Sequence, residues 1–278
     1  MQLGIRIHDG EKLPLEELLP ILRKRGFLCG HIALSKSISH HSTDVSAMTP
    51  GLAMYLKKLF FKNDMDIAVI GCYLNLAVPD SEKLRQNTEK YMAHIRFASI
   101  LGCGVVGTET GAPNMEYKYE PECRSDKSLD IFIKNLRPIV EYAEKMGVIV
   151  AIEPVLKHIV YSPRRARKVL DEIGSPNLQI IFDPVNLLGT ENYQNRTQVI
   201  NEAIELLGKD IACVHIKDFK VDGDELTACA AGTGEMDYTD IMRFIKYQKP
   251  YIHVTLENTV PENSEKAREY IESVMSKV

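Results

Sequence analysis

Short apolar runs and longer amphipathic stretches alternate eight times along this chain of 278 residues. Most of the short runs are rich in β-branched residues, which is typical of buried strands, and the longer stretches repeat their apolar residues at helical spacing. The expected strands are residues 3–9, 29–36, 66–75, 104–110, 148–154, 178–184, 212–218 and 252–258. The expected helices are residues 15–27, 51–61, 81–102, 128–147, 162–174, 192–208, 237–248 and 264–277.

Strict alternation of strand and helix predicts a parallel sheet whose strands are joined by helical crossovers. Eight such units in a chain of this length match a (β/α)8 barrel, the TIM barrel. No break in composition divides the chain, so we expect a single domain over residues 1–278. A doubly wound open sheet is the alternative fold. It is disfavoured because no G-x-G-x-x-G follows the first strand.

The overall composition narrows the classes of partner. The formal net charge of −4 argues against nucleic acid as a partner, because nucleic-acid-binding proteins need a basic surface. No apolar run reaches membrane-spanning length, and the start of the chain, MQLGIRIHDG, lacks the apolar core of a signal peptide. The six cysteines are scattered without a C-x-x-C pair, which is typical of reduced thiols. We therefore expect a cytoplasmic protein, and a homo-oligomer remains open.

The two faces of each expected strand differ in polarity, and this difference assigns an interior face. In a barrel one parity of each strand packs on the helices and should be apolar, while the other faces the interior. We assign the parity with the smaller, more polar side chains to the interior. On this assignment, the last inward side chain of each of the fourth to eighth expected strands is an acidic residue or a histidine. These residues are Glu109, Glu153, Asp183, His215 and Glu257. They should converge at the carboxyl ends of the strands, where barrel enzymes place their chemistry.

Four of these residues predict a metal site. Carboxylates crowded together in a partly dry cleft repel one another, and a bound divalent cation removes that cost. A single strand-end glutamate is usually a solvated charge, and a single histidine is usually a hydrogen-bonded core residue. Four such residues on four successive strands favour a shared ligand set of Glu153, Asp183, His215 and Glu257. Oxygen and nitrogen ligands without thiolate favour Mn²⁺, Mg²⁺ or Co²⁺, and Zn²⁺ also fits.

Other inward or loop side chains are candidate contacts for a small substrate. Arg6, His8 and Asn75 have the inward parity on the first and third strands, and Lys217 has it on the seventh. Lys217 could steady developing negative charge or a substrate carboxylate. Two further residues have open roles. Glu109 could contact the substrate or form a structural ion pair, and His158 could contact the substrate or lie on the plain surface.

The motifs resemble those of the xylose isomerase-like TIM barrels, a superfamily of sugar isomerases and epimerases, inosose dehydratases and AP endonuclease family 2 members. The matching stretches are IEP (152–154), FDPVN (182–186), VHIKD (214–218), AGTGEMDY (231–238) and TLEN (255–258). The resemblance implies a metal held by Glu153, Asp183, His215 and Glu257. In the ketose 3-epimerase branch it further implies that Glu153 and Glu257 exchange substrate protons. Two positions depart from the epimerase pattern, where Asn186 replaces a histidine and Val221 replaces an arginine.

The residues and the resemblance together predict a divalent-metal-dependent isomerase or epimerase acting on a ketose or aldose. The reaction would remove the proton beside the carbonyl and pass through an enediolate. A lyase of the inosose dehydratase type is the alternative, because the same apparatus can eliminate water. An AP endonuclease-like enzyme and a non-catalytic sugar-binding barrel are less favoured. The expected partner is a sugar or polyol, with Asn186 as a further contact to its hydroxyl groups.

Overall fold

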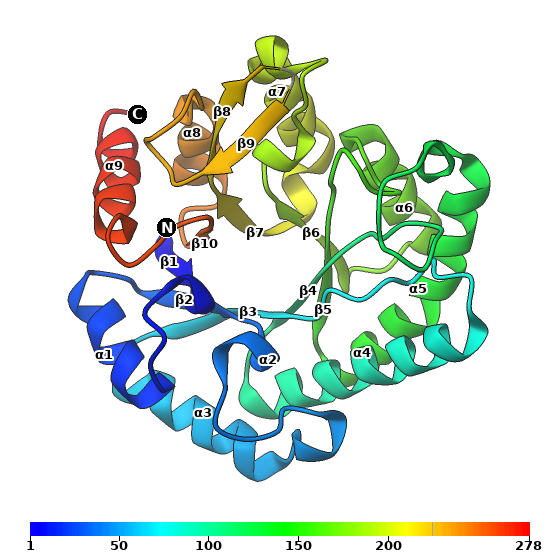
Figure 1. Ribbon diagram of the computed structural model, residues 1–278, viewed down its shortest axis with the longest axis horizontal. Helices are drawn as coiled ribbons and strands as arrows, with labels where there is room; N and C mark the ends of the chain where they lie inside the picture. Colours follow the sequence, from blue (N-terminus) through cyan, green and yellow to red (C-terminus); the bar gives the residue numbers. More distant parts are fainter. Residues whose placement is uncertain (224) are drawn as a thin grey trace.

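A computed structural model describes residues 1–223 and 225–278 and shows a closed barrel of eight parallel strands (Figure 1). The strands follow one another around the barrel in the order β1, β2, β3, β4, β5, β6, β7 and β10, and β10 pairs with β1. Their bounds are β1 Gln2–Arg6, β2 Cys29–Ile32, β3 Asp66–Gly71, β4 Val105–Glu109, β5 Ile149–Glu153, β6 Leu178–Phe182, β7 Ile211–Ile216 and β10 His253–Leu256. The predicted (β/α)8 barrel is confirmed.

In the described part of the chain, eight long helices surround the barrel, and each lies within a few residues of an expected helix (Figure 1). Their bounds are α1 Leu15–Lys24, α3 Pro50–Lys62, α4 Ser81–Leu101, α5 Asp126–Met146, α6 Pro163–Ile173, α7 Arg196–Leu207, α8 Thr239–Gln248 and α9 Ser264–Ser276. Side chains of Asp80, Ser125 and Ser162 cap the first turns of α4, α5 and α6. None of the helices in the described part of the chain is long and apolar enough to cross a membrane.

The barrel interior and the layer between barrel and helices form two separate apolar clusters. Ala151, Ile181 and Cys213 belong to the interior cluster, as the inward parity predicts. Their chain neighbours, such as Val150 and Val214, belong to the larger cluster against the helices. Beyond this cluster, at the carboxyl ends of the strands, inward positions carry buried polar side chains such as Glu153 and His215.

Two elements on this side of the barrel differ from the sequence expectation. The segment after β7, expected to be a loop, forms an antiparallel hairpin of β8 Asp218–Asp222 and β9 Glu225–Cys229. It lies beside α7 and α8 (Figure 1). The expected second strand (29–36) ends at Ile32 and is followed by a short helix, α2 Leu34–Ser37. A long connection then leads from α2 to α3, and it forms part of the cavity wall described below.

Candidate functional site

Four buried side chains meet where strands β5, β6, β7 and β10 end. Glu153 is the last residue of β5, Asp183 and Glu257 directly follow β6 and β10, and His215 lies near the end of β7. One potential ligand atom from each residue lies within 4.8 Å of the other three. Nδ1 of His215 is 3.3 Å from Oε1 of Glu153 and 3.1 Å from Oε1 of Glu257. The side chains that the sequence analysis grouped therefore lie together.

A lysine balances part of the negative charge of this cluster. Nζ of Lys217 lies 2.8 Å from Oδ2 of Asp183 and 3.5 Å from Oε2 of Glu257. Burial raises the pKa of Glu257, but the positive charges of His215, Lys217 and Arg6 outweigh burial and hold that pKa below its usual range. Burial raises the pKa of Asp183 to about 6, although Lys217 opposes the shift. The site thus favours positive charge between its carboxylates.

Backbone and amide groups orient two of the carboxylates. Oδ1 of Asp183 accepts hydrogen bonds from the backbone N–H groups of Val185 at 2.9 Å and Asn186 at 3.2 Å, which leaves Oδ2 facing the cluster. Nδ2 of Asn186 donates to Oε1 of Glu153 at 2.8 Å. Such supporting hydrogen bonds fix carboxylate ligands in metal sites.

The donor set fits a divalent cation. Three carboxylates and one imidazole, buried and without a thiolate, are typical ligands of Mn²⁺, Mg²⁺ and Co²⁺, and Zn²⁺ accepts the same groups. Nδ1 of His215 faces two of the carboxylates. Its other nitrogen, Nε2, has no hydrogen-bond partner among the described residues. The acceptor that a metal-binding histidine usually has on its second nitrogen is therefore missing here.

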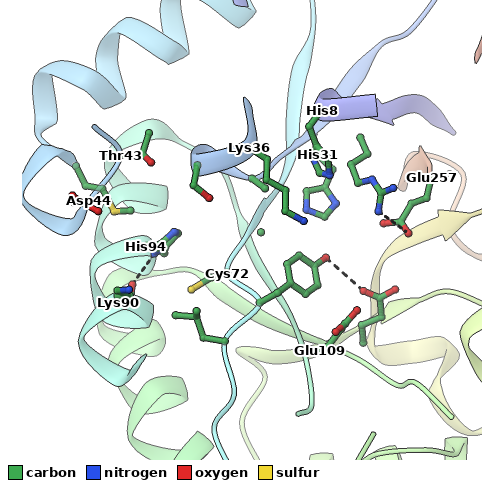
Figure 2. A pocket seen from close by; sticks show the side chains of 18 of the residues that line it. His8, His31, Lys36, Thr43, Asp44, Cys72, Lys90, His94, Glu109 and Glu257 are labelled. Atoms are coloured by element: carbon green, nitrogen blue, oxygen red, sulfur yellow. Dashed lines mark hydrogen bonds and ion pairs between the residues drawn. The ribbon is translucent and has the colours of Figure 1, made fainter. Parts of the chain in front are cut away.

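A cavity of about 470 Å³ opens above this cluster (Figure 2). Glu153 and Glu257 line it, whereas Asp183 and His215 are buried beneath its wall. Five of the expected substrate contacts also line the cavity. They are Arg6, His8, Glu109, Asn186 and Lys217. Nη1 of Arg6 lies 3.5 Å from Oε2 of Glu257, and Nε of Arg6 bonds to Asp9. The cavity therefore joins the candidate metal site to most of the predicted contacts.

Two titratable groups in the cavity wall have shifted pKa values. Burial, and then the neighbouring Arg6 guanidinium, lowers the pKa of His8 to about 4. Burial, and then repulsion from Glu153, raises the pKa of Glu109 to about 7. Tyr117 donates to Oε2 of Glu109 at 3.3 Å. Nδ1 of His158 lies 3.7 Å from that same oxygen.

Two predicted contacts, Asn75 and His158, are not among the described residues that line the cavity. The amide of Asn75 donates to the carbonyls of Ala112 at 2.7 Å and Asn114 at 2.9 Å, and its oxygen accepts from the backbone of Ala77. Two of these hydrogen bonds join the segment after β3 to the segment after β4, and the third closes a turn within the segment after β3. His158 packs edge-on against Tyr117, and burial lowers the pKa of His158 to about 4.

Two aromatic side chains that line the cavity, His31 and Tyr73, were not among the predicted site residues. His31 is 1% exposed, and neither of its ring nitrogens has a hydrogen-bond partner among the described residues. Its ring stacks on His215 and on Tyr73, with centroids 5.1 Å and 5.8 Å apart. The hydroxyl of Tyr73 lies 3.5 Å from Oε2 of Glu153. The inward parity applied to the second strand, which places Cys29 inside, would have identified His31 as well.

Asp218, the last polar residue of VHIKD, does not belong to the carboxylate and histidine cluster and has a structural role. Its buried carboxylate accepts hydrogen bonds from the backbone N–H groups of Phe219, Gly232, Gly234 and Met236, all at 2.8–3.0 Å. Asp218 therefore holds the segment 230–236 against the end of β7. A Cβ on Gly234 would lie 2.1 Å from the carbonyl oxygen of Phe219, so only glycine fits at this close approach.

The closed barrel with a carboxylate and histidine cluster at its mouth defines a TIM barrel with a candidate metal centre. The Xylose isomerase-like TIM barrel family matches residues 22–276, and the chain belongs to this family. No curated protein matches the sequence significantly.

Several solved structures share the fold over nearly the whole chain. A D-tagatose 3-epimerase-like protein is 20% identical with a TM-score of 0.78, and the alignment covers 100% of this chain and 98% of that one. A 3-keto-D-glucoside 4-epimerase from E. coli is 14% identical, with a TM-score of 0.73 and coverage of 98% and 99%. A D-psicose 3-epimerase from Clostridium cellulolyticum H10 is 14% identical, with a TM-score of 0.72 and coverage of 99% of both chains. At these identities the likeness establishes the fold.

Proposed function

We propose that this protein is a divalent-metal-dependent sugar epimerase or isomerase that moves the proton beside a substrate carbonyl. The observation that carries the proposal is that two residues of the four-residue cluster line the cavity and the other two do not. Glu153 and Glu257 line the cavity, and Asp183 and His215 lie buried beneath them. Two carboxylates can thus reach a substrate while the deeper pair helps to hold a cation. Similar folds in proteins named as sugar 3- and 4-epimerases support the same reaction type.

In this proposal Glu153, Asp183, His215 and Glu257 hold one divalent cation, with Mn²⁺, Mg²⁺ or Co²⁺ favoured. When bound, such a cation stabilises the negative charge that develops on the substrate oxygen. Glu153 and Glu257 are the groups that remove and return the proton. Both carboxylates line the cavity, where a substrate proton can come within their reach, which is the geometric requirement for a general base.

The remaining contacts position the substrate. Asn186 holds Oε1 of Glu153, and Arg6 and Lys217 hold Oε2 of Glu257, so each proposed acid–base group is oriented by a neighbour that also lines the cavity. His8 and Glu109 line the same space and are proposed to contact substrate hydroxyl groups. A carboxylate fixed within reach of its proton is what general acid–base catalysis requires.

A lyase is the second candidate, and Glu109 favours it. Glu109 is a third carboxyl group in the cavity wall besides the proposed proton-transfer pair. Elimination of water needs one base for the proton beside the carbonyl and one acid for the departing hydroxyl. Glu109 could supply that acid if the substrate carries a hydroxyl beta to the proton, as an inosose does.

The test is a panel of ketoses, aldoses and inososes incubated in D₂O with the chelated protein, alone and with Mn²⁺, Mg²⁺ or Co²⁺. Deuterium at the carbon beside the carbonyl reports proton transfer. The identity of the products distinguishes between epimerisation, isomerisation and loss of water. We expect metal-dependent exchange that is absent with EDTA and absent in Glu257→Gln. The exposed Glu172→Gln on α6 serves as the matched control. Full activity of the metal-free protein would overturn the proposal.

A further inference from the structure

The cavity is larger than a single sugar unit requires. A ketohexose has about twelve non-hydrogen atoms and would fill roughly 200 Å³, taking each atom at a little over half of the ~30 Å³ share of a liquid water molecule. The cavity measures about 470 Å³. More than half of it would therefore remain open with a free hexose bound beside Glu257.

The extra space forms an extension away from the carboxylate cluster, which we call the distal arm. It runs from His31 toward the α2–α3 connection and helix α4, as the labelled residues show in Figure 2. It is lined by Thr43, Asp44, Val45, Met48, Leu74 and His94. Val45, Met48 and Leu74 supply apolar surface, and the other three supply polar groups.

The polar groups of the distal arm include acceptors for hydroxyl hydrogens. Nδ1 of His94 lies 2.7 Å from the carbonyl oxygen of Lys90, so Nδ1 carries the hydrogen and the lone pair lies on Nε2. Burial lowers the pKa of His94, which keeps the ring neutral. Oδ2 of Asp44 accepts from Ser42 at 3.0 Å, whereas Oδ1 accepts no hydrogen bond within the described part of the chain. Apolar surface with a few placed acceptors suits a polyhydroxylated ring.

The side chains of the distal arm do not form a typical phosphate site. Phosphate sites gather arginine side chains or several backbone N–H groups around the oxygens. Here the arm instead carries the exposed carboxylate of Asp44 and the lone pair of His94. Lys36 and Lys90 also line the cavity, but both are exposed, and no arginine is among the described residues that line the arm.

We infer that the substrate carries a second, uncharged sugar unit, so that it is a keto-disaccharide or a keto-glycoside rather than a free ketose. The keto unit would lie beside Glu153 and Glu257, and the second unit would lie in the distal arm. This inference rests on the function proposed above. Binding energy from the second unit would be available to position the reacting carbon, so the longer substrate should be turned over more efficiently.

The experiment compares D-fructose with keto-disaccharides that contain a fructose unit, namely lactulose, maltulose and isomaltulose, on the manganese-loaded protein. At least one disaccharide should have a kcat/KM about tenfold or more above that of D-fructose. Val45→Trp fills the arm and should remove this advantage, while leaving D-fructose within about twofold. His94→Phe should weaken the preference too. Ile131→Trp, on α5 and as exposed as Val45, is the matched control for a new tryptophan.

Two results would overturn the inference. One is turnover of D-fructose that equals or exceeds that of every disaccharide and is unchanged by Val45→Trp. The other is a preference for fructose 6-phosphate that Lys36→Gln or Lys90→Gln abolishes, since the arm would then recognise an anion.

If none of these ketoses reacts, the proposed function fails for this class of substrate. Measuring the binding of the disaccharides then tests the distal arm separately. Saturation-transfer NMR should show contact of the second sugar ring with the wild-type protein and the Ile131→Trp control, but not with Val45→Trp. No contact in the wild type would refute the inference.

Discussion

Asp218→Asn should destabilise the protein more than any surface substitution of the same chemistry. The carboxylate is 1% exposed and accepts from four backbone N–H groups, two on each oxygen. Asparagine keeps one acceptor oxygen, so whichever way its amide turns, two N–H donors face an NH₂ group. Each unsatisfied buried donor costs about 1–3 kcal/mol, which gives a loss of about 2–6 kcal/mol.

Urea unfolding followed by circular dichroism measures this loss, and the melting temperature should fall by roughly 2–4 °C for each kcal/mol. The control is Asp171→Asn, whose carboxylate is 65% exposed and pairs with Arg167 on α6. That substitution should cost about 0.5 kcal/mol or less. Equal losses in the two variants would refute the reasoning, because the four hydrogen bonds of Asp218 would then contribute nothing beyond a surface ion pair.

Two further substitutions address the cluster itself. Lys217→Met removes the ammonium group paired with Asp183 and Glu257, so the metal-free protein should lose about 3–5 kcal/mol of stability. Added Mn²⁺ should narrow the gap in melting temperature, and an unchanged gap would argue against a shared cation site. Glu257→Gln should lower turnover by about 10²–10⁴-fold through loss of a proton-transfer group. Steady-state rates on the substrate found in the panel measure this, and wild-type turnover by this variant would exclude Glu257 as a proton-transfer residue.

The barrel and the meeting of the four residues could be predicted because both follow from local periodicity. The alternation of apolar runs specifies parallel strands, and the period of two along each strand specifies which side chains face inward. Glu153 and His215 are 62 residues apart in the chain, yet both side chains point inward from the ends of strands in one barrel. Their proximity is a consequence of closure, which the count of eight units implies.

The loops explain most of what the sequence could not predict. Asn75 has the inward parity, but β3 ends at Gly71. Beyond the end of the strand, the side-chain amide of Asn75 donates hydrogen bonds to backbone carbonyls of the β4–α5 connection. Strand periodicity does not extend into such segments. The hairpin after β7 was missed although its signal is in the sequence, since DFKVD (218–222) and ELTAC (225–229) both alternate polar and apolar residues and a D-G pair follows the first alternation.

His31 and the ion pair of Lys217 were missed for different reasons. His31 has the same parity as Cys29, which faces the barrel interior, but the inward parity was not applied to the second strand. The pair between Lys217 and Asp183 joins two strands through long side chains. Parity gives the direction of a side chain but not the position of its end.

Calorimetric titration of Mn²⁺ into the EDTA-treated protein tests the central claim most directly. Asp183 is the informative position, because it is buried beneath the cavity and its proposed role is to hold the cation. We expect one ion per chain in the wild type and binding weaker by about 100-fold in Asp183→Asn, since loss of a charged ligand removes several kcal/mol of attraction. No binding by the wild type, or equal affinity in Asp183→Asn, would contradict a metal centre at these four residues.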